Sequence, residues 1–145
     1  MALDQSQYEG LAAFRSVLRR FLAFSEAATR DAGIKPQQHQ ALLAIKAWPA
    51  PGMPMKDLAD QLQLRQNGAV QLADRLAKGG FAERRPSPTD GRSVLLHLTA
   101  KGEALLARLA EHHLNELLAC EPLLAEALGR LRRLDAQEGR APEFG

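Results

Sequence analysis

A pair of adjacent glycines, Gly79 and Gly80, separates two parts of the chain that differ in apolar periodicity. Before the pair, apolar residues recur at spacings of three and four, which is typical of amphipathic α-helices. After it, residues 81–85 and 94–98 are extended segments joined by a loop rich in proline and glycine, a pattern that predicts an antiparallel hairpin. Glycine ends helices because it adopts the left-handed conformation at no steric cost. The chain is therefore expected to be mainly helical, with one small β-hairpin.

Two short helices with a tight break between them come directly before the glycines. Residues 55–62 and 66–78 carry apolar residues at helical spacing, and the break lies at 63–65. The side chains expected to face inward from the second helix are Val70, Leu72 or Ala73, and Leu76. This spacing is typical of a helix-turn-helix, whose second helix can enter a groove of DNA.

Longer helices flank this region. The predicted ranges are 8–28, 36–48, a long helix capped by Thr99, and a final helix at 123–134. Between the second of these and the short helices, the prolines of 49–54 predict a stiff turn. Pro122 is expected to interrupt the long helix, because proline lacks an amide donor and clashes with the preceding turn. Residues 136–145 have no periodicity and are expected to be a frayed tail or a cloning remnant.

Charge is distributed unevenly along the chain. The net charge of the 145 residues is only +2, but residues 75–102 hold six lysines and arginines against two acidic residues. A local basic surface indicates an anionic partner, although a small charge excess is also typical of an ordinary solvated surface.

The sequence predicts neither an enzyme, nor a metal centre, nor a membrane protein. No apolar run reaches the roughly 18 residues that span a bilayer, and the N-terminus lacks a signal-peptide pattern, so we expect a cytoplasmic protein without a membrane partner. The single cysteine, Cys120, excludes a disulfide framework and is expected to be a buried, inert thiol rather than a redox sensor. The adjacent His112 and His113 point about 100° apart on a helix and cannot bind one metal together. His39 and His97 stand alone and no catalytic motif is present, so no cofactor is expected.

Three stretches resemble the MarR family of bacterial transcription regulators. They are LADQLQL (58–64), QNGAVQLADRLAKGGFAERRPSP (66–88) and TDGRSVLLHLTAKG (89–102). The most specific part is Asp90-Gly91-Arg92, followed by an apolar strand and Leu98-Thr99-x-x-Gly102. The flanking helices match the family's dimerisation helices in place and length, so the resemblance covers nearly the whole chain.

The resemblance implies a winged helix-turn-helix flanked by dimerisation helices. The expected organisation is an N-terminal dimerisation helix at 1–33, a DNA-binding lobe at 34–102, C-terminal dimerisation helices at 103–135 and the tail at 136–145. It implies a homodimer that binds double-stranded DNA at an inverted repeat, represses a neighbouring gene and responds to a small aromatic effector. The competing interpretation is a helical dimer that uses the same fold for protein contact without specific DNA binding.

The second short helix supplies candidate DNA-binding residues. Gln66, Asn67 and Gln71 carry amides that donate and accept at once, as the N6 and N7 atoms of adenine require. Arg65 and Arg75 are placed for phosphates. The alternatives are ordinary polar surface for the amides and an ion pair with the neighbourhood of Asp74 or a helix flank for Arg75.

The hairpin adds three positive charges, Arg84, Arg85 and Arg92, within nine residues. The resemblance implies that Arg92 enters the minor groove, where a narrow A·T-rich stretch attracts an inserted guanidinium. Asp90, two residues away, would then orient that arginine. The alternative is a loop-surface ion pair of little consequence.

The chain departs from the family pattern at three points. Met53-Pro54 stand where a serine or threonine usually caps the first short helix, and Asn67-Gly68 where a small hydroxyl residue often begins the second. Either Asn67 is the N-cap, or the missing Cβ of Gly68 lets the backbone approach DNA closely. Val70 occupies a place where many relatives have a polar base-reading residue, which leaves the target sequence open.

The outer helices carry the remaining candidate residues. Their apolar stripes have no partner within a compact winged helix, and a second copy would cover them. The representative dimerisation residues are Leu11, Leu18, Leu109 and Leu117. The aromatic walls and polar anchor of an effector pocket would come from Phe14, Phe21, His39 and Trp48, unless these are ordinary core or surface residues.

Overall fold

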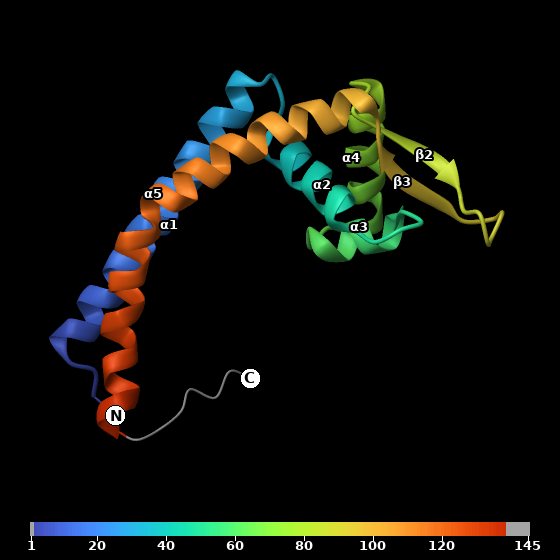
Figure 1. Cartoon of the computed structure of the whole chain (residues 1–145). Helices are drawn as coiled ribbons and strands as arrows, with labels where there is room; N and C mark the ends of the chain where they lie inside the picture. Colours follow the sequence, from blue (N-terminus) through green and yellow to red (C-terminus); the bar gives the residue numbers. More distant parts are fainter. Residues whose placement is uncertain (1, 139–145) are drawn as a thin grey trace. The chain divides into compact units, whose positions relative to one another are not determined.

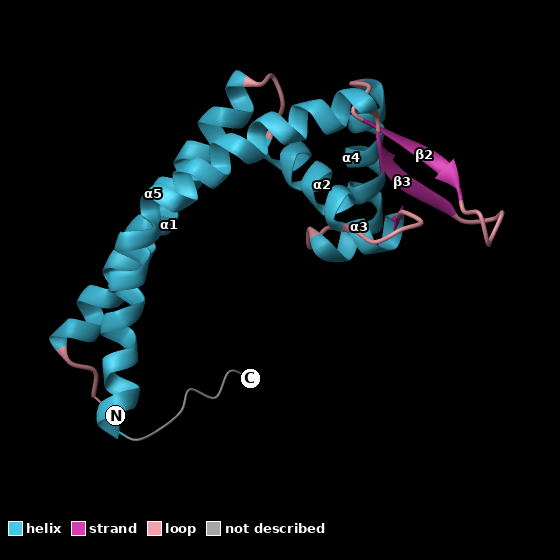
Figure 2. Cartoon of the chain, in the orientation of Figure 1, coloured by secondary structure: helices cyan, strands magenta, loops and turns pink. Residues whose placement is uncertain are grey.

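The computed structural model describes residues 2–138, and the side chains of residues 2–132. It consists of five helices and three short strands (Figures 1 and 2). In chain order they are α1 (Gln5–Asp31), α2 (Pro36–Ala47), β1 (Met53–Pro54), α3 (Met55–Gln61), α4 (Gln66–Lys78), β2 (Ala82–Pro86), β3 (Val94–Leu98) and α5 (Ala100–Glu138). The predicted fold class, mainly helical with a small β wing, is confirmed.

The described residues form two compact units. The winged-helix unit is Glu26–Glu111, and the helical unit combines the chain up to Ser25 with the chain from His112 on. This division differs from the boundaries expected after residues 33 and 102, because the beginning of α5 contributes Leu105 and Leu106 to the core of the winged-helix unit. Leu109, predicted as a dimerisation residue, is likewise buried in that core, so its side chain is not available to a second copy.

The sheet has three strands, one more than the predicted hairpin. Its order is β1-β3-β2, with both pairs antiparallel. The segment predicted as a turn at 49–54 therefore contains a short strand, in which Met53 pairs with Leu96 and Pro54 with Leu95. Burial of the Met53 side chain explains this strand, since it draws the backbone against β3. Pro54 has no amide to donate, which suits its place on an edge strand.

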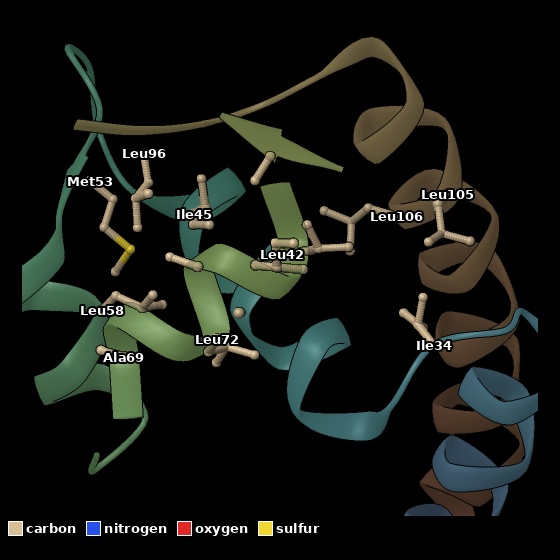
Figure 3. Packing of buried hydrophobic residues seen from close by; sticks show 14 of the residues in the cluster. Ile34, Leu42, Ile45, Met53, Leu58, Ala69, Leu72, Leu96, Leu105 and Leu106 are labelled. Atoms are coloured by element: carbon tan, nitrogen blue, oxygen red, sulfur yellow. The ribbon is translucent and has the colours of Figure 1, made fainter. Parts of the chain in front are cut away.

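A single apolar core holds the winged-helix unit together. Its buried residues come from α2, β1, α3, α4, β2, β3 and α5, and Figure 3 shows them converging, with Leu42 and Leu72 among the most completely buried. From α4 the buried side chains are Ala69, Leu72, Ala73 and Leu76. Val70, predicted to face inward, is exposed, because it lies about 100° around the helix from Ala69.

Backbone contacts fix the hairpin between α4 and α5. Gly80 has a φ of +77°, and α4 ends just before it, as the glycine pair predicts. The Thr99 hydroxyl oxygen accepts a hydrogen bond from the Gly102 amide at 3.1 Å, which confirms the predicted cap. A Cβ on Gly102 would lie 1.9 Å from the carbonyl oxygen of Phe81. Glycine at this position thus lets α5 begin directly against the residue that precedes β2.

The helical unit is formed by the first part of α1 and the last part of α5, which run side by side (Figure 1). Near one end, an ideal Cβ on Gly10 would lie 3.2 Å from the Cβ of Arg130. At the other, His113 Nε2 and Ser25 Oγ are 2.7 Å apart. Since low residue numbers on α1 face high numbers on α5, the two helices are antiparallel.

The prediction that Pro122 interrupts the long helix, with a separate final helix at 123–134, is wrong. α5 continues through it to Glu138. Proline removes the hydrogen bond that residue 122 would donate to the Leu118 carbonyl. Cys120 before it and Ala127 after it are both buried, so packing within the helical unit holds the two segments in one helix.

Candidate nucleic-acid interface

Helix α4 presents a polar face beside its buried one. Its N-cap is Arg65 and its first residue is Gln66, which rules out the alternative in which Asn67 is the N-cap. The side chains of Gln66, Asn67 and Gln71 are exposed. Within the part of the chain that the structure describes, these amides make no hydrogen bond and are available to an external partner. A Cβ on Gly68 would meet only Leu64, at 3.7 Å, so packing within the chain does not require glycine there.

Two of the candidate arginines on this surface are unpaired. Arg65 and Arg75 are exposed and form no ion pair among residues 2–132. The alternative considered for Arg75, an ion pair near Asp74, is therefore not what the structure contains. Asp74 instead accepts a hydrogen bond from Arg84 on β2, with Nη2 and Oδ1 2.6 Å apart. This pair joins α4 to the wing and offsets the negative charge on the exposed face of α4.

Arg85 on β2 also has a carboxylate partner. Its Nε lies 2.6 Å from Oε1 of Glu83, two residues earlier on the same strand. Arg84 and Arg85 thus each pair with a carboxylate of the same chain. A DNA phosphate that bound either arginine would compete with that carboxylate. Such pairs are worth little in water, so they do not prevent exchange for a phosphate.

The tip of the wing is held by the carboxylate of Asp90. One of its oxygens accepts the amide of Arg92 at 3.1 Å and the other accepts the hydroxyl of Ser93 at 2.9 Å. These bonds lower the pKa of Asp90, the Arg92 amide contributing most and the Ser93 hydroxyl next, because both stabilise the charged carboxylate. The prediction that Asp90 orients the Arg92 side chain is corrected by these contacts. The Asp90 carboxylate binds the backbone amide of Arg92 and the Ser93 hydroxyl, so it holds the backbone of the loop. The Arg92 guanidinium is exposed and makes no ion pair in the described part of the chain.

The four residues predicted for an effector pocket divide between the two units. Phe14 and Phe21 belong to the helical unit, where the ring of Phe21 packs edge-on against His113 with centroids 5.8 Å apart. His39 and Trp48 belong to the winged-helix unit, where His39 is buried. Of the four, Trp48 lines a cavity.

The cavity beside Trp48 has a volume of about 340 Å³. Arg85 and His97 also line it, and so does the ion pair between Lys46 and Glu103, whose charged atoms are 2.8 Å apart. Sequence reasoning missed this combination. These lining residues come from α2 and its C-cap, β2, β3 and α5. The pairing of β2 with β3 places Arg85 and His97 together, and no local pattern in the sequence predicts that register.

Neither a metal centre nor a membrane-spanning helix is found among the described residues. No group of three or more metal-binding side chains is close enough to hold an ion there. None of the described helices is both long and apolar enough to cross a bilayer. Cys120 is buried, with its sulfur 3.7 Å from Oε1 of Glu116.

Comparison with known proteins connects this geometry with transcription regulators. A model of the MarR family matches residues 32–93, which include α2, the helix-turn-helix, strand β2 and the loop at the tip of the wing, and end before β3. The putative transcriptional regulatory protein for the hcr operon of Thauera aromatica is 27% identical over 133 residues, 88% of this chain and 79% of that protein.

Solved structures share the fold over most of its length. The MarR family transcription regulator SP03579 superimposes with a TM-score of 0.68 at 25% identity, over 92% of this chain and 87% of that one. The complex of Staphylococcus aureus MepR with DNA gives a TM-score of 0.65 at 21% identity, over 83% of this chain and 97% of the other. At that identity, the second comparison indicates the fold alone.

Proposed function

Because this chain belongs to the MarR family of transcription regulators, we propose that it binds a specific DNA sequence as a homodimer and represses a neighbouring gene. The observation that carries the proposal is the row of exposed, unbonded amides at the start of α4, flanked by the unpaired Arg65 and Arg75. An interface for protein would more often expose aromatic or aliphatic side chains.

Helix α4 enters the major groove in this proposal. The first turns of a recognition helix reach base edges, and Gln66, Asn67 and Gln71 each carry a side-chain amide that can bind adenine with two hydrogen bonds. The amide NH₂ donates to adenine N7, and the amide oxygen accepts from the adenine N6 amino group. Arg65 and Arg75 contact phosphates, which fix the register of the helix without reading sequence.

The wing binds the adjacent minor groove. The guanidinium of Arg92 is exposed at a tip whose backbone Asp90 and Ser93 hold in one turn. A turn that is ordered before binding loses less entropy on docking, and a narrow minor groove attracts an inserted guanidinium. Asp90 therefore supports Arg92 as a positioning residue through the backbone.

The helical unit provides the dimer interface. Leu11 and Leu18 on α1, and Leu117 on α5, are between 38% and 47% exposed. A two-fold axis through such an interface would place two α4 helices about 34 Å apart, so the operator is an inverted repeat with half-sites about one helical turn apart.

A small aromatic effector regulates DNA binding in this proposal. The cavity beside Trp48 supports it, because it offers an indole, the imidazole of His97 and the cationic Arg85 on a wing strand. A ligand changes DNA affinity only if it binds the DNA-competent and DNA-incompetent arrangements unequally.

Fluorescence anisotropy with the full-length chain tests the central proposal. The duplexes are the DNA upstream of its own gene and a scrambled duplex, each at several salt concentrations. We expect tighter binding to the upstream DNA, with affinity that falls steeply as salt rises. Equal binding to both duplexes, or none at any salt, would favour the protein-contact interpretation.

A substitution at the wing separates DNA binding from folding. Arg92→Ala is expected to weaken binding about 5- to 150-fold, the factor that corresponds to about 1–3 kcal/mol, with the dimer intact. The control is Arg30→Ala, an exposed arginine at the end of α1. If Arg92→Ala and its control bind alike, the wing is not part of the interface.

A further inference from the structure

One side chain on the exposed face of α4 does not match its polar surroundings. Val70 is 36% exposed, although valine is among the residues that most often become buried. Among the described residues from 26 to 111, the large hydrophobic side chains with this degree of exposure are Leu43, Val70 and Val94. Of these three, Val70 is the one that lies on α4.

The core of the winged-helix unit is complete without Val70. Its neighbours Ala69 and Leu72 are 0% and 1% exposed, and they belong to the buried cluster, whereas Val70 does not. The buried cluster is thus formed without the valine, which leaves its exposed methyl groups available to an external partner.

The position of Val70 places it among the groups that would face base edges. It lies three and four residues after Asn67 and Gln66, so one helical turn separates them on the same face. Asp74 lies one turn further along. Its charge is paired with Arg84, so a bare carboxylate does not oppose the negative potential of a DNA groove next to Val70.

The chemistry of the major groove selects a partner for such a side chain. Of the four bases, thymine alone presents a methyl group there, while the other bases present hydrogen-bonding atoms. Valine makes no hydrogen bonds, and placing it on a polar edge leaves that edge unsatisfied. Its χ1 is nearly fixed within a helix, so little conformational entropy is lost when its methyl groups are covered.

We propose that Val70 contacts the C5-methyl group of one thymine in each half-site of the operator. The inference deepens the proposed function and rests on it, because α4 must lie in the major groove. It makes Val70 a specificity-determining residue beside the amides: these favour adenine, and the valine favours a thymine at a neighbouring base pair.

The test begins with the full-length protein and a random-sequence pool of duplexes, from which bound sequences are enriched. Each thymine of the enriched half-site is then replaced, one at a time, by deoxyuridine, which pairs identically and lacks only the methyl group. With the unaltered protein, one replacement is expected to weaken binding about fourfold per half-site, the factor for about 0.8 kcal/mol per buried methyl-sized group. Replacing both symmetric copies should weaken it about 15-fold.

Val70→Ala identifies the residue responsible. The variant should bind the thymine duplex about fourfold more weakly per half-site and should no longer respond to deoxyuridine at that position, while its response at other thymines is unchanged. Leu43→Ala removes another exposed aliphatic side chain, from α2, and should keep the full response. Circular dichroism and thermal unfolding check that both variants are folded.

The possible failures are distinguishable. A pool that yields no enriched sequence overturns the proposed function, and the inference with it. An enriched sequence whose thymines all tolerate deoxyuridine, or a Val70→Ala variant that still responds at every thymine, overturns the inference and leaves DNA binding standing.

Discussion

The winged-helix unit and the helical unit are built from similar amphipathic segments, but they differ in how completely one chain covers their apolar faces. In the winged-helix unit, residues of seven elements meet in one buried core. In the helical unit, two helices cover one face of each other. Among its described side chains, the large hydrophobic ones left exposed are Leu3, Tyr8, Leu11, Leu18, Leu22, Leu114, Leu117, Leu118, Leu123 and Leu128.

The arrangement of these exposed residues distinguishes a stripe from scattered surface leucines. On α1, Tyr8, Leu11, Leu18 and Leu22 are separated by three, seven and four residues, so they share one side of the helix. Exposed apolar surface of this extent and order marks an interaction site. Helical periodicity thus predicts that a face will be covered, but it does not say whether the same chain or a second one covers it.

The largest expected effect tests the completeness of the winged-helix core. Leu42→Ala removes a side chain with no exposure, and it should lower the free energy of unfolding by about 2–5 kcal/mol because it leaves a cavity. Leu43→Ala, at the next residue of α2, truncates a leucine that is 49% exposed and should cost less than about 0.5 kcal/mol. Urea unfolding measures both, and equal losses would contradict the division between core and surface.

The second effect tests the incompleteness of the helical unit. Leu117→Glu places a charge in the exposed apolar stripe of α5 and should weaken the proposed homodimer about 30-fold or more, as expected for a buried, unpaired charge. Sedimentation equilibrium measures the dimer constant. The control is Ala119→Glu, an exposed position about 200° around the same helix. A dimer that tolerates Leu117→Glu as well as the control would mean that another surface joins the copies.

Local signals in the sequence were sufficient for most of the fold and not for its long-range details. The glycine pair, the Thr99 cap and the helical spacing gave the helices and the wing, since each acts within a few residues. The β1 strand could not be predicted, because it depends on pairing between Met53 and Leu96 across 43 residues of sequence. The continuity of α5 at Pro122 also depends on packing against a distant segment.

For the candidate interface too, local pattern predicts some features, and contacts between distant segments determine the others. That Arg65, Gln66 and Gln71 would be exposed follows from helical spacing, and the structure agrees. The Asp74–Arg84 pair and the outward position of Val70 were missed, because they depend on strand placement and on which side of α4 meets the core. DNA contact by these residues stays a prediction.

Glycine at position 68 provides a smaller effect that separates stability from DNA binding. Gly68→Ala should raise the free energy of unfolding by about 0.5–1 kcal/mol, because alanine favours the helix and the new Cβ meets only Leu64 at an ordinary distance. If the glycine serves close approach of the backbone to DNA, the same variant binds the enriched duplex more weakly although it is more stable. Thermal unfolding and anisotropy are measured on the same preparation. Higher stability with unchanged DNA affinity means that the glycine affects the helix alone, and higher stability with weaker binding means that it serves close approach to DNA.

The ion pair between Asp74 and Arg84 should contribute still less to folding. Its side chains are 59% and 35% exposed, so a double-mutant cycle with Asp74→Asn and Arg84→Gln is expected to give a coupling of about 0.2–1 kcal/mol. The measurement is urea unfolding at low and at high salt, and the coupling should decrease with salt. A coupling of several kcal/mol would mean that the wing depends on this pair rather than on the core.

The smallest effect is expected at the tip of the wing, which should be ordered by its own hydrogen bonds and not by a second chain. The pKa of Asp90 is lowered, so its carboxylate stays charged as pH falls through the usual aspartate range. Its bonds to the Arg92 amide and the Ser93 hydroxyl are therefore lost only when pH falls through the lowered pKa. An NMR titration should show the Arg92 amide shift following the Asp90 carboxyl with that low midpoint. The midpoint should be the same at every protein concentration, and Asp90→Asn, which does not titrate, should abolish the transition. A midpoint that changed as the proposed dimer dissociated would instead link the wing tip to the helical unit. The winged-helix unit would then not be complete within one chain.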